Sequence, residues 1–505
     1  MAAPKEIFIS SDPQETRVAI TENKRLEEFY VERSSDQRMV GSIYKGRVTS
    51  IVPGIGAAFV DIGLGKNGFL YVSDIVEPTP EEDAVLEGEP AEGQRVPLPH
   101  QRRSRIEEVV KPHQEILVQV VKEPFGTKGA RLTTHISLPG RYMVLMCNDS
   151  RMGISKRIED PQERGRLREI LARLRFSQEA GLIIRTAGTG KGEKEFVRDV
   201  RYLSRVFQHI KRTAARAKAP VCLHHEYKLS QRVIRDSFTE DTHRIVVDAK
   251  SEFHDLRRFL QVLIPGVRVH LDLYRGEEPL FEKEGLDEQI AALFDKRVEL
   301  PSGGSIVIEP TEGLVAIDVN TAKFTGRRNL EETAFQVDKE AAVETARQLR
   351  LRDVGGIVVI DFIDLEVPAH RRELVKTLED ALARDRAKTN LVSFSEICVA
   401  ELTRQRMRRS VETVSYQPCP YCGGRGSVKS PVTMAIEAIR QAKRALKHAQ
   451  HKTLELLVHP QVAVRLLQED RPSLSALEQQ AKSKILVLSD PSLHFEQVKV
   501  NVSNA

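Results

Sequence analysis

The sequence predicts a multidomain protein built from β and α/β domains. The chain has 505 residues, more than usually pack around a single hydrophobic core, so we expect about three to five domains. Short strand patterns separated by glycines fill residues 41–72, and regular short strands are typical of a small barrel. A strand, a long helix and a second strand follow one another in residues 314–365, which indicates a parallel α/β unit.

The composition is that of an ordinary globular protein, with 40% hydrophobic and 30% charged residues. The formal net charge of +5 permits a polyanionic partner without requiring one. The sequence has no apolar stretch of about 18 residues that could span a membrane, and its first residues lack the apolar core of a signal peptide. Five cysteines in so long a chain argue against a disulfide framework. We therefore expect a cytoplasmic protein without a membrane span.

The N-terminal strand patterns lack a core of their own. They lie at residues 6–9 and 16–20 and are joined by a polar connection, so they must pair with another part of the chain. The barrel pattern is interrupted by the Pro- and Glu-rich residues 77–114 and resumes with a strand at 116–120. An interruption of this length and composition indicates an inserted surface loop.

The remaining regions alternate helices with strands, which predicts α/β or α+β domains. The expected helices are 161–176, 193–215, 252–262, 369–385 and 433–451, and the expected strands are 181–185, 244–247 and 453–458.

Two apolar strands of residues 314–365 end on carboxylates, Asp318 and Asp361. The strand period of two places Asn320 on the face of Asp318, whereas Asp364 would point away from Asp361. We expect an apolar strand end to desolvate a carboxylate, a cost that a cation can offset. Two carboxylates and an amide suit Mg²⁺, which prefers oxygen ligands. The alternative is that the aspartates cap turns or pair with a nearby arginine such as Arg350.

The barrel region contains a glycine motif and two candidate base-stacking residues. Residues 63–68 match GxGxxG, but a strand follows the motif where a dinucleotide site needs a helix, so we expect a hairpin. Phe59 and Phe69 are interleaved with Lys45 and Arg47, which is typical of base-stacking surfaces on small barrels. The alternative for each phenylalanine is a place in the core.

A glycine-rich loop at residues 185–192 follows the strand at 181–185. It fails as a Walker motif, because Arg185 stands at the first glycine position and Lys191 is followed by glycine. An arginine at a strand end, the Thr186 hydroxyl and glycine amides can still bind a terminal phosphate. A solvated glycine loop is the alternative.

Cys419 and Cys422 form a CxxC turn followed by glycines, which suits zinc coordination by two thiolates. Cys147, Cys222 and Cys398 stand singly, and we expect them to be buried small side chains. Half of a four-cysteine site implies that a second chain supplies the other half. A redox pair or a turn without metal is the alternative.

These segments together resemble the bacterial RNase E/G endoribonucleases over almost the whole chain. The motifs that carry the resemblance are GSIYKGRVTSIVPGIGAAFVDIG, GLIIRTAGTGKG, LPSGGSIVIEPTEGLVAIDVNT, RQLRLRDVGGIVVIDFIDLE and CPYCGGRG. The resemblance implies a multidomain α/β and β fold. Its expected parts are an RNase H-like domain split between 1–37 and 231–293, an OB-fold RNA-binding domain at 38–134 with the inserted loop 77–114, a 5′-sensor at 135–230, a deoxyribonuclease-I-like catalytic domain at 294–414, a zinc link at 415–428 and a small dimerisation domain at 429–505.

The resemblance also assigns roles to individual residues. It implies that Asp318 and Asp361 hold a catalytic Mg²⁺, with Asn320 orienting Asp318 or a water. The other implied positions are Gly140, Val144, Arg185 and Thr186 around a 5′-monophosphate, Phe59, Phe69, Lys122 and Lys128 along an RNA channel, and Cys419 and Cys422 on one Zn²⁺ shared by two chains. Lys388 replaces an expected catalytic-site arginine and Lys156 an expected RNA-contacting arginine, so bidentate phosphate contact is in doubt at both.

The implied activity is a Mg²⁺-dependent, single-strand-specific endoribonuclease of rRNA and tRNA processing and mRNA decay. It would be stimulated by a 5′-monophosphate and would leave 3′-hydroxyl and 5′-phosphate ends. The shared zinc implies a homodimer and leaves a dimer of dimers open. A non-catalytic RNA-binding protein is the alternative, which the intact set Asp318, Asn320 and Asp361 disfavours. A phosphodiesterase acting on nucleotides or DNA would leave Phe59 and Phe69 unexplained.

Overall fold

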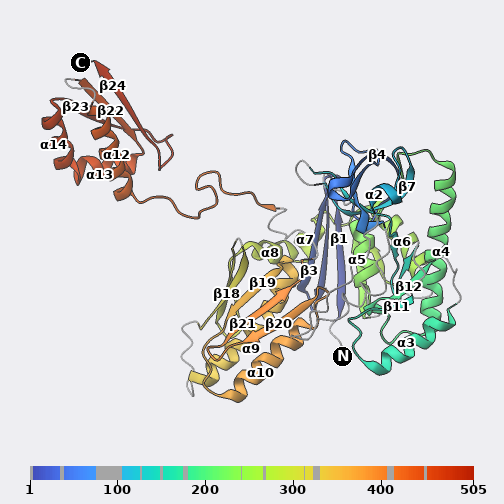
Figure 1. Ribbon diagram of the computed structural model, residues 1–505. Coiled ribbons are helices and arrows are strands. Elements are labelled where there is room, and N and C mark those ends of the chain that lie inside the picture. Colours follow the sequence, from blue (N-terminus) through green and yellow to red (C-terminus); the bar gives the residue numbers. More distant parts are fainter. Residues whose placement is uncertain are drawn as a thin grey trace, which may run out of the picture. The chain divides into compact units, whose positions relative to one another are not determined.

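Five β-sheets organise the part of the chain that the computed structural model describes (Figure 1). The described residues are 4–34, 39–75, 105–124, 128–147, 152–174, 180–239, 241–264, 269–311, 313–321, 330–406, 415–447 and 452–504. Four sheets belong to a unit of residues 1–411 and the fifth to a unit of residues 412–505. Among the described residues no helix is both long and apolar enough to cross a membrane.

The first sheet joins the N-terminus to the middle of the chain, as expected for strands without a core of their own. Its order is β15 (Leu271–Leu273), β14 (Thr242–Val247), β1 (Lys5–Ser11), β2 (Glu15–Glu22) and β3 (Arg25–Arg33). β1 and β14 are parallel, with Ile7 opposite Ile245. The helices of this region are α5 (Leu229–Ser237), α6 (Lys250–Leu263), α7 (Leu280–Lys283) and α8 (Leu286–Ala291). Leu256 of α6 and Ile7 share one buried core. The polar strand β3 was not predicted.

The second sheet is a closed five-stranded barrel to which one further strand is added. Its strands are β4 (Ile43–Val52), β5 (Ala57–Asp61), β6 (Gly68–Tyr71), β8 (Arg131–Thr133) and β7 (Glu115–Lys122), and β7 pairs with β4 to close it. β13 (Val221–His224) extends β4 on its other side. β5 and β6 pair antiparallel, which confirms the hairpin expected at the GxGxxG motif. Most of the inserted loop 77–114 lies outside the described residues, which include α2 (Ile106–Val109).

The third sheet has the order β11 (Met152–Ile154), β12 (Gly181–Ile184), β10 (Met143–Met146) and β9 (Ser137–Pro139). It packs against α3 (Pro161–Arg173) and α4 (Glu193–Arg216), close to the bounds expected from the sequence. α4 is strongly amphipathic, because Phe196, Leu203 and Ile210 are buried on one side. Its C-terminal end reaches the barrel, where Lys45 Nζ donates to the Ala214 and Ala217 carbonyls at 3.1 and 2.9 Å.

The fourth sheet contains the predicted α/β unit. Its order is β16 (Arg297–Glu299), β17 (Ser305–Pro310), β18 (Leu314–Asn320), β19 (Gly356–Asp361), β21 (Val399–Arg404) and β20 (Thr389–Phe394). β18 and β19 are parallel and are joined through α9 (Leu330–Arg352). α9 and α10 (Pro368–Leu382) share one core with the sheet and cover the same face of it (Figure 1). Side chains on the opposite face, such as Leu314 and Ile357, are exposed.

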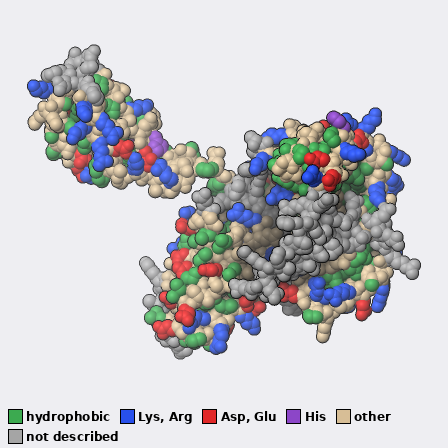
Figure 2. All heavy atoms as spheres, in the orientation of Figure 1, with side chains coloured by type: hydrophobic (Ala, Val, Ile, Leu, Met, Phe, Trp, Pro, Cys, Tyr) green, Lys and Arg blue, Asp and Glu red, His purple; other side chains and the backbone are tan. Residues whose placement is uncertain are grey.

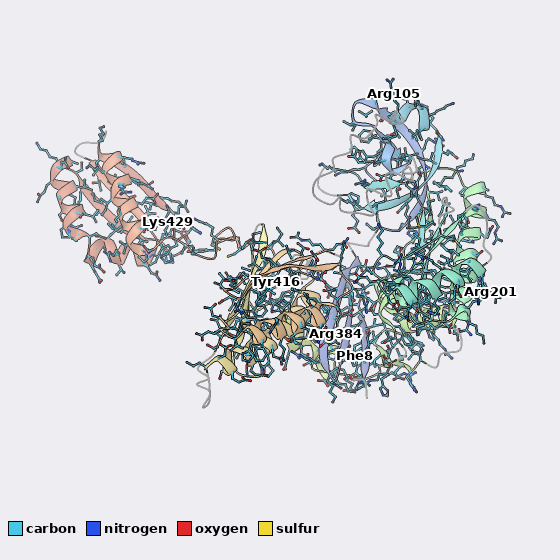
Figure 3. The ribbon with its side chains drawn as sticks, turned by 60° about the horizontal axis from the view of Figure 1, so that its bottom comes forward. Phe8, Arg105, Arg201, Arg384, Tyr416 and Lys429 are labelled. Atoms are coloured by element: carbon cyan, nitrogen blue, oxygen red, sulfur yellow. The ribbon has the colours of Figure 1, made fainter. Side chains whose placement is uncertain are left out.

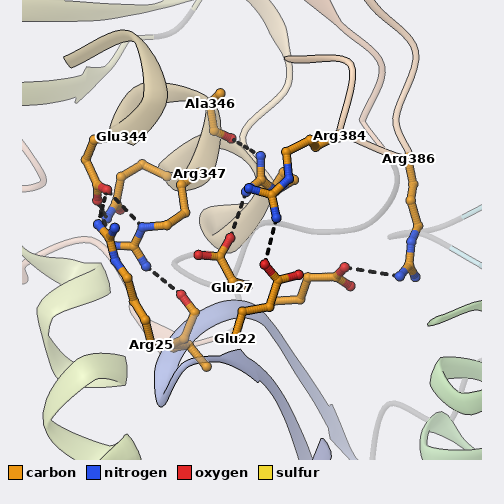
Figure 4. A network of polar contacts seen from close by, with 12 residues as sticks. Glu22, Arg25, Glu27, Glu344, Ala346, Arg347, Arg384 and Arg386 are labelled. Carbon is orange, nitrogen blue, oxygen red and sulfur yellow. Dashed lines mark hydrogen bonds and ion pairs between the residues drawn. The ribbon is translucent and has the colours of Figure 1, made fainter. Parts of the chain in front are cut away.

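Ion pairs attach α9 and the segment that follows α10 to strands β3 and β2 of the first sheet (Figure 4). Arg25 contacts Glu344 at 2.5 Å, Arg350 contacts Glu27 at 2.9 Å and Arg384 contacts Glu22 at 2.7 Å. Glu344, Arg350 and Glu27 are largely buried, so removal of one partner would leave an uncompensated charge away from water. These pairs therefore fix the fourth sheet against the first.

The C-terminal unit is a three-stranded sheet of order β23 (Lys484–Ser489), β22 (Lys452–Val458) and β24 (Val498–Asn504). It packs with α12 (Pro431–Leu446), α13 (Pro460–Gln468) and α14 (Arg471–Ala481) in one core. α12 and β22 confirm the predicted small α/β tail. The last two helices and strands were not predicted.

Candidate active site and RNA-binding surfaces

The two strand-end aspartates lie side by side in the fourth sheet. Asp318 and Asp361 are directly opposite each other in the parallel pair β18 and β19. The Asn320 amide Nδ2 donates to Asp318 Oδ2 at 2.6 Å from the same face of β18. The strand β19 ends at Asp361, so Asp364 lies three residues beyond it. The structure thus brings together the three residues that periodicity selected.

The expected desolvation of these carboxylates is wrong, because both side chains are exposed. In β18 the buried residues alternate with exposed ones, and the aspartate shares the exposed face. The cause is that α9 and α10 cover one face of the sheet, whereas a fully buried parallel sheet has helices on both. Figure 2 shows hydrophobic and acidic side chains together over the part of this sheet that holds β18 and β19.

The donor set fits a magnesium ion. The described residues contain no group of three or more His, Cys, Asp or Glu side chains that could hold a metal. The candidate ligands at this site are therefore the carboxylates of Asp318 and Asp361 and the amide of Asn320. Mg²⁺ is usually held by one or two carboxylates and keeps several waters, so this sparse and open set suits it better than a closed protein cage. The suggested pairing with arginine finds no support among the described residues, where Arg350 contacts Glu27 and Arg352 contacts Gln348.

The chain segment after Asp361 is held by side chains of α9. The Ile363 N–H donates to Asp338 Oδ1 at 3.1 Å, and the Glu366 and Val367 N–H groups donate to Glu331 at 3.1 Å each. Asp338 is fully buried, and its Oδ2 has no partner among the described residues. Burial raises the pKa of Asp338 to about 7. These contacts fix the end of β19 and so the position of Asp361, a role that the sequence did not reveal.

The structure does not bring Lys388 to the two aspartates. Lys388 precedes β20, whose first residue Thr389 pairs with Arg404, and Arg404 pairs with Gly356 at the start of β19. Asp361 is at the other end of β19, about 16 Å along the strand. The expected catalytic placement of Lys388 therefore finds no support in the strand register. The pairing of β20 and β21, which decides the matter, was not predicted.

Arg185 lies at the end of β12 and is oriented by the surrounding protein. Its Nη1 contacts Asp236 Oδ1 at 2.8 Å and donates to the Gly140 carbonyl at 2.6 Å. In the described part of the chain its Nε and Nη2 donate to no protein acceptor. Burial opposes ionisation of Asp236, but Arg235 and Arg185 outweigh burial and lower the pKa of this carboxyl. An oriented guanidinium with free donors is suited to a phosphate.

We call the surroundings of Gly140, Arg185 and Thr186 the pocket, and a buried carboxylate fixes the backbone beside it. Asp199 of α4 accepts the N–H groups of Arg141, Tyr142 and Met143 at 2.8 to 3.1 Å. A Cβ atom on Gly140 would lie 2.6 Å from the Asp199 oxygens, so this position requires glycine. Val144 of β10 pairs with Pro139, the residue that precedes Gly140. Sequence reasoning did not identify Asp199 or Asp236, because 50 or more residues separate Asp199 from the N–H groups that it accepts and Asp236 from Arg185.

The pocket borders the fourth sheet through Arg157. Thr186 is exposed, and its hydroxyl lies 3.4 Å from that of Ser155. Two residues on, Arg157 Nη2 donates to the Asp385 and Ala387 carbonyls at 3.0 and 3.3 Å. Lys156 and Lys388 adjoin these contacts and are exposed. The two lysines that replace expected arginines are therefore placed beside the pocket.

An outward-facing row of side chains crosses four strands of the barrel. Phe59 pairs with Phe69, Phe69 with Arg131, and Arg131 with Lys122. The phenylalanine rings are half-buried with centroids 4.5 Å apart, whereas the neighbouring core positions are filled by smaller aliphatic side chains. The core alternative for Phe59 and Phe69 is thus wrong. Lys122 and Lys128 are exposed, as a surface for a polyanion requires.

Tyr71 extends this row next to Arg131. Neither residue was identified from the sequence. The Tyr71 ring stacks near Phe69 with centroids 6.5 Å apart, and the Arg131 guanidinium lies 5.4 Å from the Tyr71 centroid. Asp74 accepts from Arg131 at 3.0 and 3.1 Å and so fixes its plane. The strand alternation after Phe69 could have identified Tyr71, because residues two apart share a face.

The CxxC turn has the backbone of a metal-binding knuckle. The Gly423 N–H donates to the Cys419 carbonyl at 2.8 Å, and the Gly426 N–H donates to Cys422 Sγ at 3.3 Å. The Gly426 amide is the main cause that lowers the pKa of the Cys422 thiol. Gly423 and Gly426 have φ angles of +61° and +73°, which glycine adopts readily. Two thiols on this turn fit half of a tetrahedral zinc site.

Sequence comparisons agree with this architecture. Residues 37–134 match the S1 RNA binding domain, residues 137–407 match the Ribonuclease E/G family, and residues 418–503 match the RNase E/G thioredoxin-like domain. These matches define the class as a ribonuclease that carries an RNA-binding barrel. The thioredoxin-like character of the last unit was not predicted.

The chain belongs to the Ribonuclease E/G family. It is 40% identical over 497 residues to Ribonuclease G of Escherichia coli, which covers 98% of this chain and 99% of that protein. It is 40% identical over 470 residues to Ribonuclease G of Haemophilus influenzae, which covers 93% of each chain. Identity to Ribonuclease E of Escherichia coli is 37% over 477 residues, 94% of this chain but 44% of that longer protein.

Proposed function

We propose that the protein is a Mg²⁺-dependent, single-strand-specific endoribonuclease stimulated by a 5′-monophosphate end. The observation that carries the proposal is the direct pairing of Asp318 with Asp361, with Asn320 bonded to Asp318, on an exposed sheet face. An RNA strand can reach this face. The proposal extends to rRNA and tRNA processing and mRNA decay in the cytoplasm, and membership of the Ribonuclease E/G family supports its coarser part, a role in RNA processing.

In the proposed mechanism, Asp318 and Asp361 supply the oxygens that hold the ion, and Asn320 orients the Asp318 carboxylate. An ion held by these residues would supply Lewis-acid chemistry, by which a water could be acidified and charge on the phosphodiester neutralised. Cleavage would leave a 3′-hydroxyl and a 5′-phosphate. Because the two carboxylates repel a phosphate by themselves, we expect RNA to approach productively only when the cation is present.

RNA binding would be divided between the barrel and the phosphate pocket. The row of Phe59, Phe69 and Lys122 offers base stacking beside a cation. Arg185, held by Asp236 and Gly140, would donate its free N–H groups to a terminal phosphate next to the Thr186 hydroxyl. Within the proposal, the first sheet is an RNase H-like domain, the third a 5′-sensor and the fourth a deoxyribonuclease-I-like domain.

The proposed assembly is a homodimer in which Cys419 and Cys422 of each chain share one Zn²⁺. The C-terminal unit contains only these two cysteines, which is half of a four-thiolate site. Metal analysis combined with native mass measurement tests this point. One Zn²⁺ per two chains agrees with the proposal, whereas a zinc-loaded monomer contradicts it. Native mass also separates a dimer from a dimer of dimers.

The activity is tested with two single-stranded RNAs that differ only in a 5′-monophosphate or a 5′-hydroxyl. Wild-type protein and Asp318→Ala are compared in Mg²⁺. We expect cleavage by the wild type alone, and faster cleavage of the monophosphorylated RNA. Equal cleavage by both proteins would reject the catalytic assignment and leave a non-catalytic role for these residues. Equal rates on both RNAs would reject the 5′-sensor.

A further inference from the structure

Helix α4 carries a one-sided row of cations on its exposed face. At about 100° per residue, the six cations fall within an arc of about 60° around the helix axis. They are all exposed, and we call them the α4 basic face: Lys194, Arg198, Arg201, Arg205, Arg212 and Arg216. The opposite side of α4 is buried in the core, where Leu203 and Ile210 lie. Figure 3 labels Arg201 on the outer side of this helix.

The charge on this face is not balanced locally. Residues 193–218 contain eight lysines and arginines against three acidic residues, so this short segment has the net charge of +5 found for the entire chain. Within the described parts of the chain, Arg201, Arg205, Arg212 and Arg216 form no ion pair with a carboxylate. Like charges four residues apart destabilise a helix, so the row does not serve the stability of α4.

Some arginines on other helices of the same unit pair with a carboxylate of their own helix. On α3, Arg173 pairs with Glu169 at 3.4 Å. On α9, Arg347 pairs with Glu344 at 2.6 Å. Residues 200–220, in contrast, contain no aspartate or glutamate. The α4 basic face is therefore a feature of this helix and not of the surface in general.

The face extends from the phosphate pocket to the barrel. α4 begins seven residues after Thr186, and Asp199 in its second turn holds the floor of the pocket. Its C-terminal end is bonded to Lys45 of the barrel. The distance along the axis from Lys194 to Arg216 is about 33 Å. Figure 2 shows lysine and arginine side chains at the edge of the molecule where the upper part of α4 lies.

We propose that the α4 basic face binds the phosphate backbone of RNA at a place separate from the 5′-phosphate pocket and the aromatic row of the barrel. The inference rests on the proposed function only in taking RNA as the polyanion. None of the six side chains is aromatic, whereas single-strand surfaces usually combine cations with aromatic platforms. Cations alone suit the backbone of a folded region of the substrate, which is recognised through shape and phosphates.

A membrane surface is a poorer partner for this helix. An interfacial helix inserts an exposed apolar face among the lipids. On α4 the apolar face is already buried against the third sheet, through residues such as Phe196 and Leu203. Only the charged face remains for a partner, and RNA is the polyanion for which the barrel and the pocket are already suited.

The test is RNA binding by the full-length protein without divalent ions, so that no cleavage occurs. The variant combines Arg201→Gln, Arg205→Gln and Arg212→Gln, because glutamine keeps helix propensity and removes charge. Fluorescence anisotropy is measured at several salt concentrations with a 5′-hydroxyl RNA hairpin and a 5′-hydroxyl single strand. We expect about tenfold weaker binding near physiological salt, and a salt slope lower by about 0.9 for each lost duplex phosphate contact.

The matched control neutralises three exposed cations of α6, with Lys250→Gln, Arg257→Gln and Arg258→Gln. The control should bind RNA like the wild type. If the α4 variant loses affinity only for the hairpin, duplex RNA is the source of the phosphates. If it loses affinity equally for both probes, the face binds the backbone of single-stranded and duplex RNA alike. Both outcomes support the proposal. Equal binding by the α4 and α6 variants overturns it, as does weaker binding to anionic vesicles with RNA binding unchanged.

A failure of the wild-type protein to bind either RNA would reject the proposed function itself. A wild type that binds RNA, together with an α4 variant that binds equally well, would reject only this inference. The probes lack a 5′-phosphate, so Arg185 does not contribute to the difference. The melting temperature of the α4 variant should equal or exceed that of the wild type, because the substitutions remove like-charge repulsion.

Discussion

In the proposed function, the pocket around Arg185 and the aspartate pair would handle the same chemical group, a phosphate, in opposite ways. At the pocket, the protein would provide its own cation, Arg185, which is oriented by Asp236 and the Gly140 carbonyl. At the pair, Asp318 and Asp361 are exposed carboxylates that would depend on an external cation. The comparison teaches that the position of Arg185 is fixed by surrounding residues, whereas the positions of the two aspartates are fixed chiefly by the register of their strands.

The largest expected effect comes from Asp361→Asn. Removing a ligand charge should lower the cleavage rate by about a thousandfold or more, since a metal ion contributes several kcal/mol to stabilisation of the transition state. The side chain is exposed, so the melting temperature should change little. Single-turnover cleavage and thermal unfolding measure the two effects. Asp364→Asn, also exposed and three residues away, serves as the control and should cleave normally.

The next effect comes from Arg185→Gln at the pocket. Charge-assisted hydrogen bonds contribute about 1.5–3 kcal/mol, so cleavage of 5′-monophosphorylated RNA should fall by roughly 10–100-fold. Cleavage of the 5′-hydroxyl RNA should stay near the wild-type rate, because Arg185 has no phosphate to bind there. A parallel loss on both RNAs would show that Arg185 acts on folding or catalysis and would remove the contrast between the two regions.

A smaller effect is expected from Arg157→Gln. This substitution weakens the contact between the part of the chain that holds the pocket and the part that contains the fourth sheet. Arg157 donates to the Asp385 and Ala387 carbonyls next to Lys388. Since each such bond contributes about 1 kcal/mol, we expect a loss of roughly three- to tenfold in stimulation by the 5′-monophosphate. Competition between the two RNAs measures it. Arg168→Gln, an exposed arginine of α3, should leave stimulation intact, and the same loss in that variant would exclude a specific role for Arg157.

The last effect concerns stability and not cleavage: a pH dependence that originates at Asp338, behind the aspartate pair. Burial raises the pKa of Asp338 to about 7 from an ordinary value of 3.8. The folded protein therefore binds this proton more tightly than the unfolded chain, and its contribution to stability falls as the pH rises from about 4 to 7. Asp338→Asn keeps an acceptor for the Ile363 N–H and cannot ionise.

The melting temperature of Asp338→Asn relative to the wild type should thus rise between pH 5 and pH 8, by about 2–4 °C for each kcal/mol. Thermal unfolding at both values tests this. Asp380→Asn on α10 provides the comparison, since its carboxyl is exposed. An unchanged difference between Asp338→Asn and wild type across this range would contradict the expected titration.

The sequence predicted more of the aspartate pair than of its surroundings. The period of two along β18 was sufficient to group Asp318 with Asn320 and to exclude Asp364, because side-chain direction in a strand is a local property. Exposure was predicted wrongly, since it depends on how many faces of the sheet the helices cover. Lys388 was misplaced relative to the aspartates because the pairing of β20 and β21 is not encoded in a local pattern.

At the pocket, too, the sequence identified the residues that belong to a local pattern and missed those that are brought in from distant parts of the chain. Arg185 and Thr186 were identified from the end of a strand and the glycines that follow. Asp199 and Asp236, which hold the pocket in shape, gave no local signal, because the pocket residues that they contact, Tyr142 and Arg185, lie far from them in the sequence. At the barrel, Phe59 and Phe69 were ambiguous until the strand pairing placed both on the outer surface.

The central claim is that Asp318 and Asp361 together hold the ion that cleaves RNA. The most direct test counts bound Mn²⁺, an oxygen-preferring substitute for Mg²⁺, by electron paramagnetic resonance in the wild type and in the double variant Asp318→Asn/Asp361→Asn. The account predicts one fewer bound ion per chain in the variant, together with loss of cleavage and retained RNA binding. An unchanged ion count, or a double variant that still cleaves RNA, would contradict it.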